Sequence, residues 1–348
     1  MDAAAALDEI ALLLERELAN PFKAKAFRRA SAAIAGLDAE ELSRRIADGS
    51  LRRTKGIGDT SYTVIAEAAE GRVPDYLAEL RAKLGGGEAE SALRRELRGD
   101  LHSHTDWSDG TTSLPVMAAA ARDAGLEYLV VTDHSPSLRV ANGLSAERLE
   151  TQLDLVEALD TGHGEGDGGL GIRLVPGIEV DILAGGELDQ RDELLARLGI
   201  VVGSVHSKLR MPAEEMTPRM LRAIAHPRLN VLGHCTGRLV RGSRGTRPQS
   251  EFDAHAVFAA CAEHGVAVEI NSRPEREDPP DELIALALDA GCLFSIDSDA
   301  HAPGHFAFLG LGAARAERAG VPAERIVNTW PLERLLDWAG GSAPAGPA

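Results

Sequence analysis

Hydrophobic positions recur at helical spacing along the first quarter of the chain. Over residues 1–84 this spacing predicts five short helices, which cover residues 3–18, 22–37, 38–48, 61–71 and 74–84. We therefore expect the chain to begin with a small all-helical domain.

From residue 97 onwards, short apolar runs alternate with helical patterns. The runs predict seven strands, at residues 97–104, 128–134, 174–181, 200–206, 231–234, 266–271 and 293–299. Helices are predicted between them at residues 114–124, 146–159, 219–225, 253–264, 281–290 and 310–319. This alternation is typical of a parallel α/β domain. It fits an open doubly wound sheet, which gathers its site at a switch point, and a closed barrel, which gathers one from many strand ends.

The two patterns meet in a glycine-rich stretch after Leu84. Residues 85–91 have the sequence GGGEAES, a composition that ends a helix and is typical of a flexible linker. We therefore predict a helical domain at 1–84, a linker at 85–96 and an α/β domain at 97–340. The last residues, 341–348, are rich in Gly, Pro and Ala, and we expect a disordered tail there.

Charge and histidine are divided unevenly between the two predicted domains. The 348 residues carry a net charge of −17, of which −2 falls on residues 1–100 and −15 on the rest, and none of the 11 histidines precedes residue 102. A hydrophobic fraction of 44% is typical of a folded soluble protein. The acidic start excludes a signal peptide or membrane span, and three cysteines are too few for a disulfide framework. We expect a cytoplasmic protein that needs no membrane and no obligatory protein partner.

Six of the seven predicted strands deliver a histidine or a carboxylate at their carboxyl ends. His102 and His104 are two residues apart on one strand, so their side chains share a face and can bind one metal. Candidate ligands at the ends of so many strands favour the closed barrel over the open sheet. The full set of candidate ligands is His102, His104, Asp109, His134, Glu179, His206, His234, Asp299 and His301.

Nine ligands are too many for one metal ion, so the sequence predicts two or three. Imidazole together with carboxylate suits zinc, manganese or iron rather than magnesium or calcium. Such a cluster lowers the pKa of a bound water towards neutrality and holds the oxygens of a phosphoryl group. The expected reaction is phosphoester hydrolysis by a metal-bound hydroxide.

Five segments resemble the successive motifs of the PHP (polymerase and histidinol phosphatase) phosphoesterase family. They are DLHSHT at 100–105, VTDHSP at 131–136, GIEVD at 177–181, SVHS at 204–207 and DSDAH at 297–301. The resemblance implies a distorted, TIM-like (β/α)7 barrel with three metal ions. It implies one ion at His102, His104, Glu179 and Asp299, a second at Glu179, His206 and His234, and a third at Asp109, His134 and His301.

A basic hairpin is predicted before the helix at 61–71. Gly56 and Gly58 flank Ile57, and backbone N–H groups at the start of the next helix can bind an anion near Lys55. With NPFKAKAFRRA at 20–30, this segment resembles the helix-hairpin-helix domain of bacterial family X DNA polymerases. The resemblance implies that Lys55, Gly56 and Gly58 contact DNA phosphates. An ordinary turn and a solvated helix face are the alternative.

Two further segments, SPSLRVANG at 135–143 and EINSRPER at 269–276, resemble the PHP domain of the same polymerases. That domain is a manganese-dependent 3′-to-5′ exonuclease that processes DNA 3′ ends. The short segment 85–96 leaves no room for the polymerase palm. Arg139 and Arg273 are our best candidates for holding phosphate groups during catalysis. Four other cations follow strands at the same end, namely Lys208, Arg210, Arg238 and Arg276.

Three functions are compatible with these observations. The first is a metal-dependent phosphoesterase that processes DNA ends without polymerase activity. The second is a small-molecule phosphatase of the histidinol-phosphatase type, acting on a phosphorylated metabolite, which the acidic barrel favours. The third is a non-catalytic DNA-binding protein, which nine ligands disfavour because a structural zinc needs four.

Overall fold

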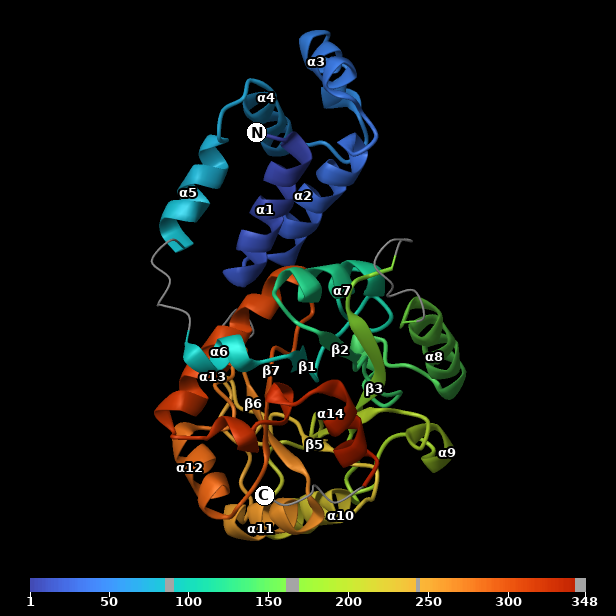
Figure 1. Ribbon diagram of the computed structural model, residues 1–348, viewed down its shortest axis with the longest axis vertical. Helices are drawn as coiled ribbons and strands as arrows, with labels where there is room; N and C mark the ends of the chain where they lie inside the picture. The colour runs from blue at the N-terminus through green and yellow to red at the C-terminus, as the bar shows by residue number, and fades with distance from the viewer. Residues whose placement is uncertain (85–90, 161–168, 242–244, 342–348) are drawn as a thin grey trace. The chain divides into compact units, whose positions relative to one another are not determined.

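The computed structural model describes residues 1–84, 91–160, 169–241 and 245–341, and the chain forms two compact units, residues 1–89 and 90–348. The first unit is all-helical, as the sequence predicts (Figure 1). Its elements are α1 (Ala3–Arg16), α2 (Pro21–Ile34), α3 (Ala39–Ala47), the 3-10 turn η1 (Leu51–Arg53), α4 (Asp59–Ala69) and α5 (Asp75–Leu84).

Side-chain caps fix where three of these helices begin. Asp2, Asn20 and Asp38 each accept a hydrogen bond from a backbone N–H of the first turn that would otherwise have no partner. The apolar faces of the helices then meet in a single core that includes Leu7, Ile10, Phe27, Leu51, Ile57, Val64, Ile65 and Leu77.

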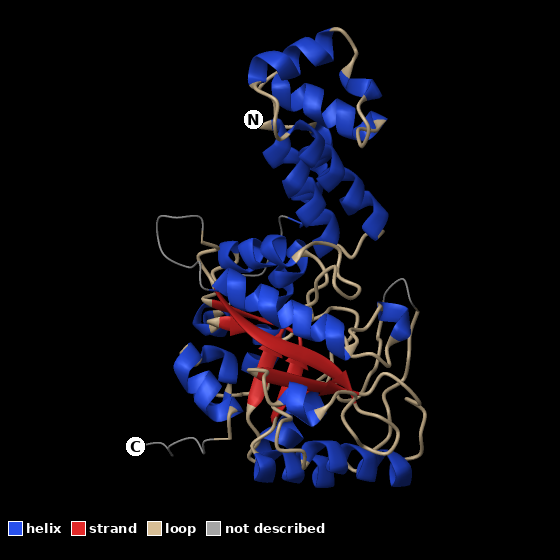
Figure 2. Ribbon diagram, turned by 90° about the vertical axis from the view of Figure 1, so that its right-hand side faces the viewer, coloured by secondary structure: helices blue, strands red, loops and turns tan. Residues whose placement is uncertain are grey.

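The second unit contains a seven-stranded parallel sheet in which each strand pairs with the next one along the chain. The strands are β1 (Gly99–Asp100), β2 (Tyr128–Val131), β3 (Arg173–Asp181), β4 (Ile200–Ser204), β5 (Val231–Leu232), β6 (Ala267–Asn271) and β7 (Phe294–Asp297). Helices lie outside the strands (Figure 2). They are α6 (Ala92–Glu96), α7 (Leu114–Asp123), α8 (Ala146–Asp160), α9 (Asp192–Leu195), α10 (Ala213–Ile224), α11 (Ala254–His264), α12 (Asp281–Asp289), α13 (Leu309–Arg318) and α14 (Leu332–Ala339).

The sheet closes between β1 and β7. Near their carboxyl ends Ser103 pairs with Ala300 in a parallel bridge, and the His104 N–H donates to the Ala300 carbonyl at 2.7 Å. At the amino ends the Asn328 side chain fills the gap. Its amide donates to the carbonyls of Gly99 (3.1 Å) and Ile296 (2.9 Å), and its oxygen accepts from the Ile296 N–H at 2.7 Å. The predicted barrel is therefore confirmed.

Side chains alternate along the strands between two cores. Tyr128 and Val130 of β2 point into the barrel, where they join an interior core with Val175, Ile200 and Val202. Leu129 and Val131 instead belong to the layer between the sheet and the helices. Strands buried on both faces are continuous apolar runs, which is why all seven could be predicted.

The structure departs from the prediction in several places. The ladders end before the predicted strand ends, since β1 stops at Asp100 and β5 at Leu232. Residues 92–96 of the predicted linker form α6, whose Leu93 N–H donates to Glu317 Oε1 at 2.8 Å. The helix predicted at residues 219–225 starts earlier in the structure, where α10 begins at Ala213 and contains Pro218.

Three further observations concern the carboxyl-terminal part of the chain and the membrane. α14, which we did not predict, places Leu335 and Trp338 in the interior core. The expected disordered tail, apart from Gly341, lies outside the described residues. Across the described ranges no helix is both long and apolar enough to span a bilayer.

Candidate metal centre

The nine predicted ligands gather at the carboxyl ends of the strands. Three groups of side chains have ligand atoms that all lie within 4.8 Å of one another. The groups are His102, His104 and Asp299; His104, Asp109, His134 and His301; and His134, Glu179 and His206. The groups share His104 and His134, so they form one continuous cluster.

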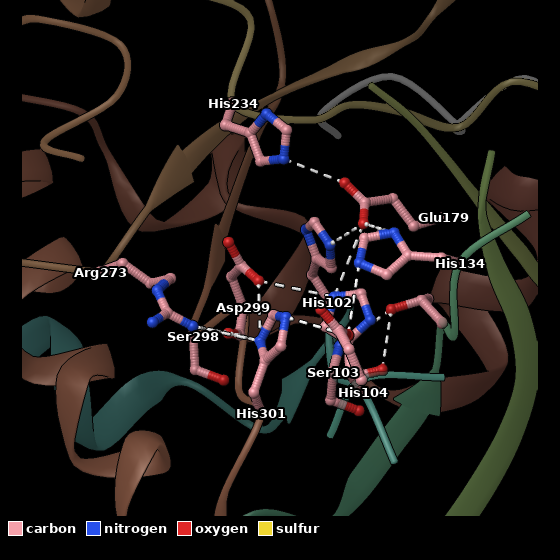
Figure 3. Close-up of polar contacts among 12 residues, drawn as sticks. His102, Ser103, His104, His134, Glu179, His234, Arg273, Ser298, Asp299 and His301 are labelled. Atoms are coloured by element: carbon pink, nitrogen blue, oxygen red, sulfur yellow. Dashed lines mark hydrogen bonds and ion pairs between the residues drawn. The ribbon is translucent and has the colours of Figure 1, made fainter. Parts of the chain in front are cut away.

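Glu179 joins two sets of histidines through its two oxygens (Figure 3). Its Oε1 lies 3.0 Å from His234 Nε2 and 3.3 Å from His206 Nε2. Its Oε2 lies 3.3 Å from His102 Nε2 and 2.8 Å from His134 Nδ1. A carboxylate whose oxygens face different ligand sets is placed to bridge two cations.

Two aspartates complete the other side of the cluster. Asp299 Oδ1 lies 3.5 Å from His104 Nε2 and 3.3 Å from His301 Nδ1. Asp109 Oδ1 lies 3.3 Å from His301 Nε2 and 3.5 Å from His134 Nε2. His301 thus stands between the two carboxylates, with one ring nitrogen towards each.

These separations fit divalent metal ions. Zinc bonds of about 2.0–2.1 Å in a tetrahedron separate neighbouring ligand atoms by about 3.3–3.4 Å. In the described part of the chain, His102 Nε2, His104 Nε2 and Glu179 Oε1 are buried without a hydrogen-bond partner. A buried polar atom without a partner is destabilising by about 1–3 kcal/mol, and a cation would satisfy all three. The residues present therefore suit a divalent metal centre.

The protonation states of the carboxylates also suit cations. Burial raises the pKa of Glu179, but the facing His102 and His206 outweigh it and hold this pKa well below its usual range. Burial likewise opposes ionisation of Asp299, but contact with His104 and Arg276 lowers its pKa well below normal. Both groups are therefore carboxylates, the form that binds a metal.

The surroundings of the cluster shift the pKa values of two histidines in opposite directions. Burial, together with His301 and His134, lowers the pKa of His104 to about 4, which keeps its ring neutral. Burial lowers the pKa of His206 too, but Glu179 and Asp181 outweigh it and raise the value to about 9. The raised pKa of His206 means that Glu179 and Asp181 stabilise a positive charge at this position, as they would stabilise a cation.

Buried carboxylates behind the cluster orient its histidines. Glu269 Oε1 lies 2.5 Å from His102 Nδ1, and its Oε2 accepts the His234 backbone N–H at 2.5 Å. Asp181 accepts from His206 Nδ1 in the same way. The two ring bonds fix the tautomers of His102 and His206 that turn their Nε2 atoms towards Glu179, and the backbone bond holds the segment that carries His234.

We did not predict Glu269 or Asp181 as part of the site. Asp181 follows Glu179 by two residues on β3, so the alternation of side chains along a strand was the available signal. Glu269 belongs to β6, the one strand without a candidate ligand at its end.

Two candidate ligands have strained backbones. His234 has φ +22° and Asp299 has φ +49°, in a region that non-glycine residues rarely adopt. Two hydrogen bonds keep the strained Asp299 in place. Its Oδ2 accepts from Asn271 Nδ2 at 3.1 Å and from Arg276 Nε at 3.2 Å. Strain retained by such over-determination is typical of functional sites.

The predicted phosphate-binding arginines have different environments. Arg273 is buried, donates to Glu275 Oε1 at 2.6 Å and to the Asp299 carbonyl at 3.0 Å, and so supports the cluster from behind. Arg238 and Arg276 also turn inwards, onto the Glu277 carbonyl and Asp299. Arg139 is exposed in the 3-10 turn η2 (Arg139–Ala141).

Three of the nine candidate ligands are partly exposed. The side chains of Asp109, His301 and His206 are 37%, 20% and 14% exposed. Those of the other six ligands are at most 6% exposed. We call the part of the cluster formed by Asp109, His301 and His206 its mouth, because these are its most exposed candidate ligands.

The predicted hairpin lies in the first unit, between η1 and α4. Gly56 has φ +98°, a conformation that favours glycine, and Ile57 is buried in the helical core. Gly58 caps α4, and its N–H donates to Ser61 Oγ at 2.9 Å. Lys55, Gly56 and Gly58 are exposed, so the structure presents all three to solvent.

Comparison with known proteins identifies the second unit. A family model described as "PHP domain" matches residues 100–273, half of the chain. The chain belongs to the PHP family. The resemblance found in the sequence motifs is thus confirmed, and PHP membership makes the protein a hydrolase of phosphoester bonds.

This chain covers different shares of the lengths of its relatives. It is 33% identical to the DNA polymerase/3′-5′ exonuclease PolX of Bacillus subtilis over 68% of its own length, but covers only 40% of that protein. It is 29% identical to a probable phosphatase of Aliivibrio fischeri and 27% to the probable phosphatase YcdX of Escherichia coli, and covers 88% and 96% of them. A crystal structure of histidinol phosphate phosphatase from Lactococcus lactis is 17% identical, with a TM-score of 0.47, covering 64% of this chain and 94% of that one.

Proposed function

We propose that this protein is a divalent-metal-dependent phosphoesterase that removes nucleotides from DNA 3′ ends and has no polymerase activity. Hydrolysis is supported by the bridging position of Glu179 between two sets of histidines. DNA as the substrate is supported by the 33% identity to a polymerase whose name includes a 3′-5′ exonuclease.

We assign the metal-holding residues from the contacts. His102, His104 and Asp299 would hold one ion, Glu179 would bridge it to a second near His206 and His234, and Asp109, His134 and His301 would hold a third. Zinc, manganese and iron all suit this donor set. When bound, such ions polarise phosphoryl oxygens and supply a nucleophilic water at neutral pH.

The chain's own residues orient the substrate-facing groups. Glu269 and Asp181 hold His102 and His206 in one tautomer. Arg276 and Asn271 hold Asp299 Oδ2, which leaves Oδ1 directed at His104 and His301. A scissile phosphate enters at the mouth, where Asp109 and His301 are partly exposed.

The hairpin is the proposed contact for the DNA backbone. Gly56 and Gly58 carry no side chains that would obstruct a phosphate, and Lys55 adds a positive charge beside them. Such contacts bind without reading sequence. They supply the affinity for nucleic acid that a barrel region with a net charge of −15 does not.

The test is manganese-dependent release of nucleotides from a 3′-recessed duplex labelled at its 5′ end. Asp299→Ala, purified in parallel, controls for a contaminating nuclease. We expect a ladder of shortened products from the wild type alone. A metal-loaded wild type that gives no ladder would overturn the proposal.

A second candidate function is hydrolysis of a small phosphorylated metabolite. It is favoured because the chain spans 88% and 96% of two probable phosphatases but 40% of the polymerase. Release of inorganic phosphate from histidinol phosphate and other monoesters by the same preparation tests it. Faster turnover of a monoester than of DNA would replace the first proposal by the second.

A further inference from the structure

The loop after β4 lies at the mouth of the metal centre. It begins at His206, whose side chain is one of the three exposed ligands, and continues through Ser207 and Lys208 to Met211. A substrate that approaches the cluster beside His206 passes this loop. Its side chains are therefore placed to contact the parts of a substrate that extend beyond the reacting phosphate.

The backbone of this loop is held in a strained conformation. Lys208 has φ +52°, in the left-handed region that a lysine rarely adopts. Its carbonyl accepts the Met211 N–H at 2.9 Å, and the next carbonyl, of Leu209, accepts from Ser250 Oγ at 2.8 Å. These bonds keep the strained turn in place, and strain kept in this way is found at functional sites.

A buried arginine anchors the same loop. Arg219 of α10 is 2% exposed, and its Nη1 donates to the Ser207 carbonyl at 2.9 Å. Its Nε donates to the Leu183 carbonyl at 2.9 Å, in the loop after β3. Among the described residues Arg219 forms no ion pair with a carboxylate. Its guanidinium instead donates hydrogen bonds to backbone carbonyl groups. The arginine fixes the segment that follows Glu179 and the segment that follows His206 relative to each other.

This loop carries two cations, Lys208 and Arg210. Lys208 and Arg210 are exposed, and their side chains make no hydrogen bond or ion pair with the part of the chain that the structure describes. Arg238, Arg273 and Arg276, which follow neighbouring strands, are in contrast turned inwards onto protein groups. Lys208 and Arg210 are thus cations held at the mouth with their charge available.

We propose that Lys208, assisted by Arg210, binds a phosphate next to the scissile one on a polynucleotide strand. This inference rests on the proposed function, because a small phosphomonoester has no second phosphate at that position. Lys208 lies two residues beyond His206, on the order of 7 Å along the backbone. The lysine side chain therefore starts near the cluster without being one of its candidate ligands, within reach of a phosphate that neighbours the scissile one.

The charge of the surroundings supports the assignment. Residues 101–348 carry a net charge of −15, so the barrel as a whole repels a nucleic acid. Unpartnered cations beside the mouth counteract this repulsion where a strand has to enter. A lysine there binds any phosphate as a point charge, which suits an activity without sequence preference.

The experiment compares Lys208→Gln with Arg197→Gln in the full-length, metal-loaded protein. Arg197 is an exposed cation that precedes β4 and therefore lies at the opposite end of that strand from Lys208. Both variants lose one positive charge. Steady-state hydrolysis of a single-stranded oligonucleotide is measured over a series of salt concentrations, and bis(p-nitrophenyl) phosphate, with a single phosphate, is measured beside it.

We expect Lys208→Gln to raise the KM for the oligonucleotide about 5–10-fold and to reduce the salt slope of log KM by about 0.7, the value for one phosphate contact on a single strand. Lys208→Arg should restore the KM, and Arg197→Gln should behave as the wild type. The KM for bis(p-nitrophenyl) phosphate should change much less than that for the oligonucleotide.

Two results would overturn the inference while leaving the proposed function intact. One is a wild type that degrades DNA while Lys208→Gln and Arg197→Gln have the same KM and salt slope. The other is an equal loss on the small diester and the oligonucleotide, which would indicate damage to the metal centre. A metal-loaded wild type that hydrolyses monoesters but no DNA would instead remove the proposed function, and this inference with it.

Discussion

Glu269→Gln is the most informative perturbation of the metal centre, because it keeps the size of the side chain and removes only its charge and one acceptor. The Glu269 carboxylate faces three N–H groups, from His102 Nδ1 (2.5 Å), the His234 backbone (2.5 Å) and Asn271 Nδ2 (3.2 Å). A glutamine offers one oxygen and one NH2 group. In either orientation its NH2 group therefore faces at least one N–H that needs an acceptor.

The expected magnitude comes from these contacts. Glu269 is completely buried, so water does not replace the lost acceptor. Loss of a buried hydrogen bond to a charged group is destabilising by about 1.5–3 kcal/mol. Substitution of a residue that hydrogen-bonds to metal-binding histidines typically weakens metal binding or activity about 10–100-fold. We expect a loss in this range, because Glu269 orients two ligands at once.

The assay is zinc or manganese affinity by competition with a chelating indicator, together with hydrolysis of bis(p-nitrophenyl) phosphate. Glu127→Gln is the matched control, since Glu127 is 55% exposed and pairs with Arg98 on the surface. It should bind metal as the wild type does. Metal affinity of Glu269→Gln within twofold of the wild type would refute the role that we give to the bonds behind the cluster.

Three other predictions follow from the structure. Asp299→Ala and His102→Ala should each abolish phosphoester hydrolysis while the circular dichroism spectrum is retained, and turnover by either purified variant would remove them from the site. Lys55→Glu should weaken binding of duplex DNA in a filter or anisotropy assay with little effect on a small diester, whereas unchanged DNA affinity would exclude the hairpin. Arg219→Leu leaves buried carbonyls without a donor and should lower the free energy of unfolding by about 3 kcal/mol. The exposed Arg222→Leu in the same helix should change it far less, and equal effects would show that the Arg219 bonds contribute little.

The sequence predicted the barrel and the cluster well for a physical reason. Strands buried on both faces are mostly apolar, so a polar residue near their carboxyl end stands out, as at His134 and Glu179. Parallel pairing brings all those ends to one face of the barrel. Nine side chains from distant parts of the chain could therefore be assigned to one place without knowledge of their contacts.

Other features depend on contacts between segments that have no local pattern. Glu269 acts through His102 and His234, which lie on other strands. Arg273 was predicted to face a substrate phosphate, but its guanidinium is bound to Glu275, an acceptor that composition alone does not single out. The helix α6 is short and polar in sequence, and its packing against α13 through the Leu93 to Glu317 bond is a tertiary effect.

The closure of the barrel by Asn328 bears on how this protein comes to fold. Until residues 326–330 are in place, the gap between the amino ends of β1 and β7 stays open, and unpaired strand edges are templates for pairing with other chains. One side-chain amide replaces the missing rungs between them. During synthesis His102 and His104 emerge long before Asn328, yet the wall that carries them can be completed only after it. A substitution at Asn328 should therefore show itself first as aggregation rather than as a defect in catalysis.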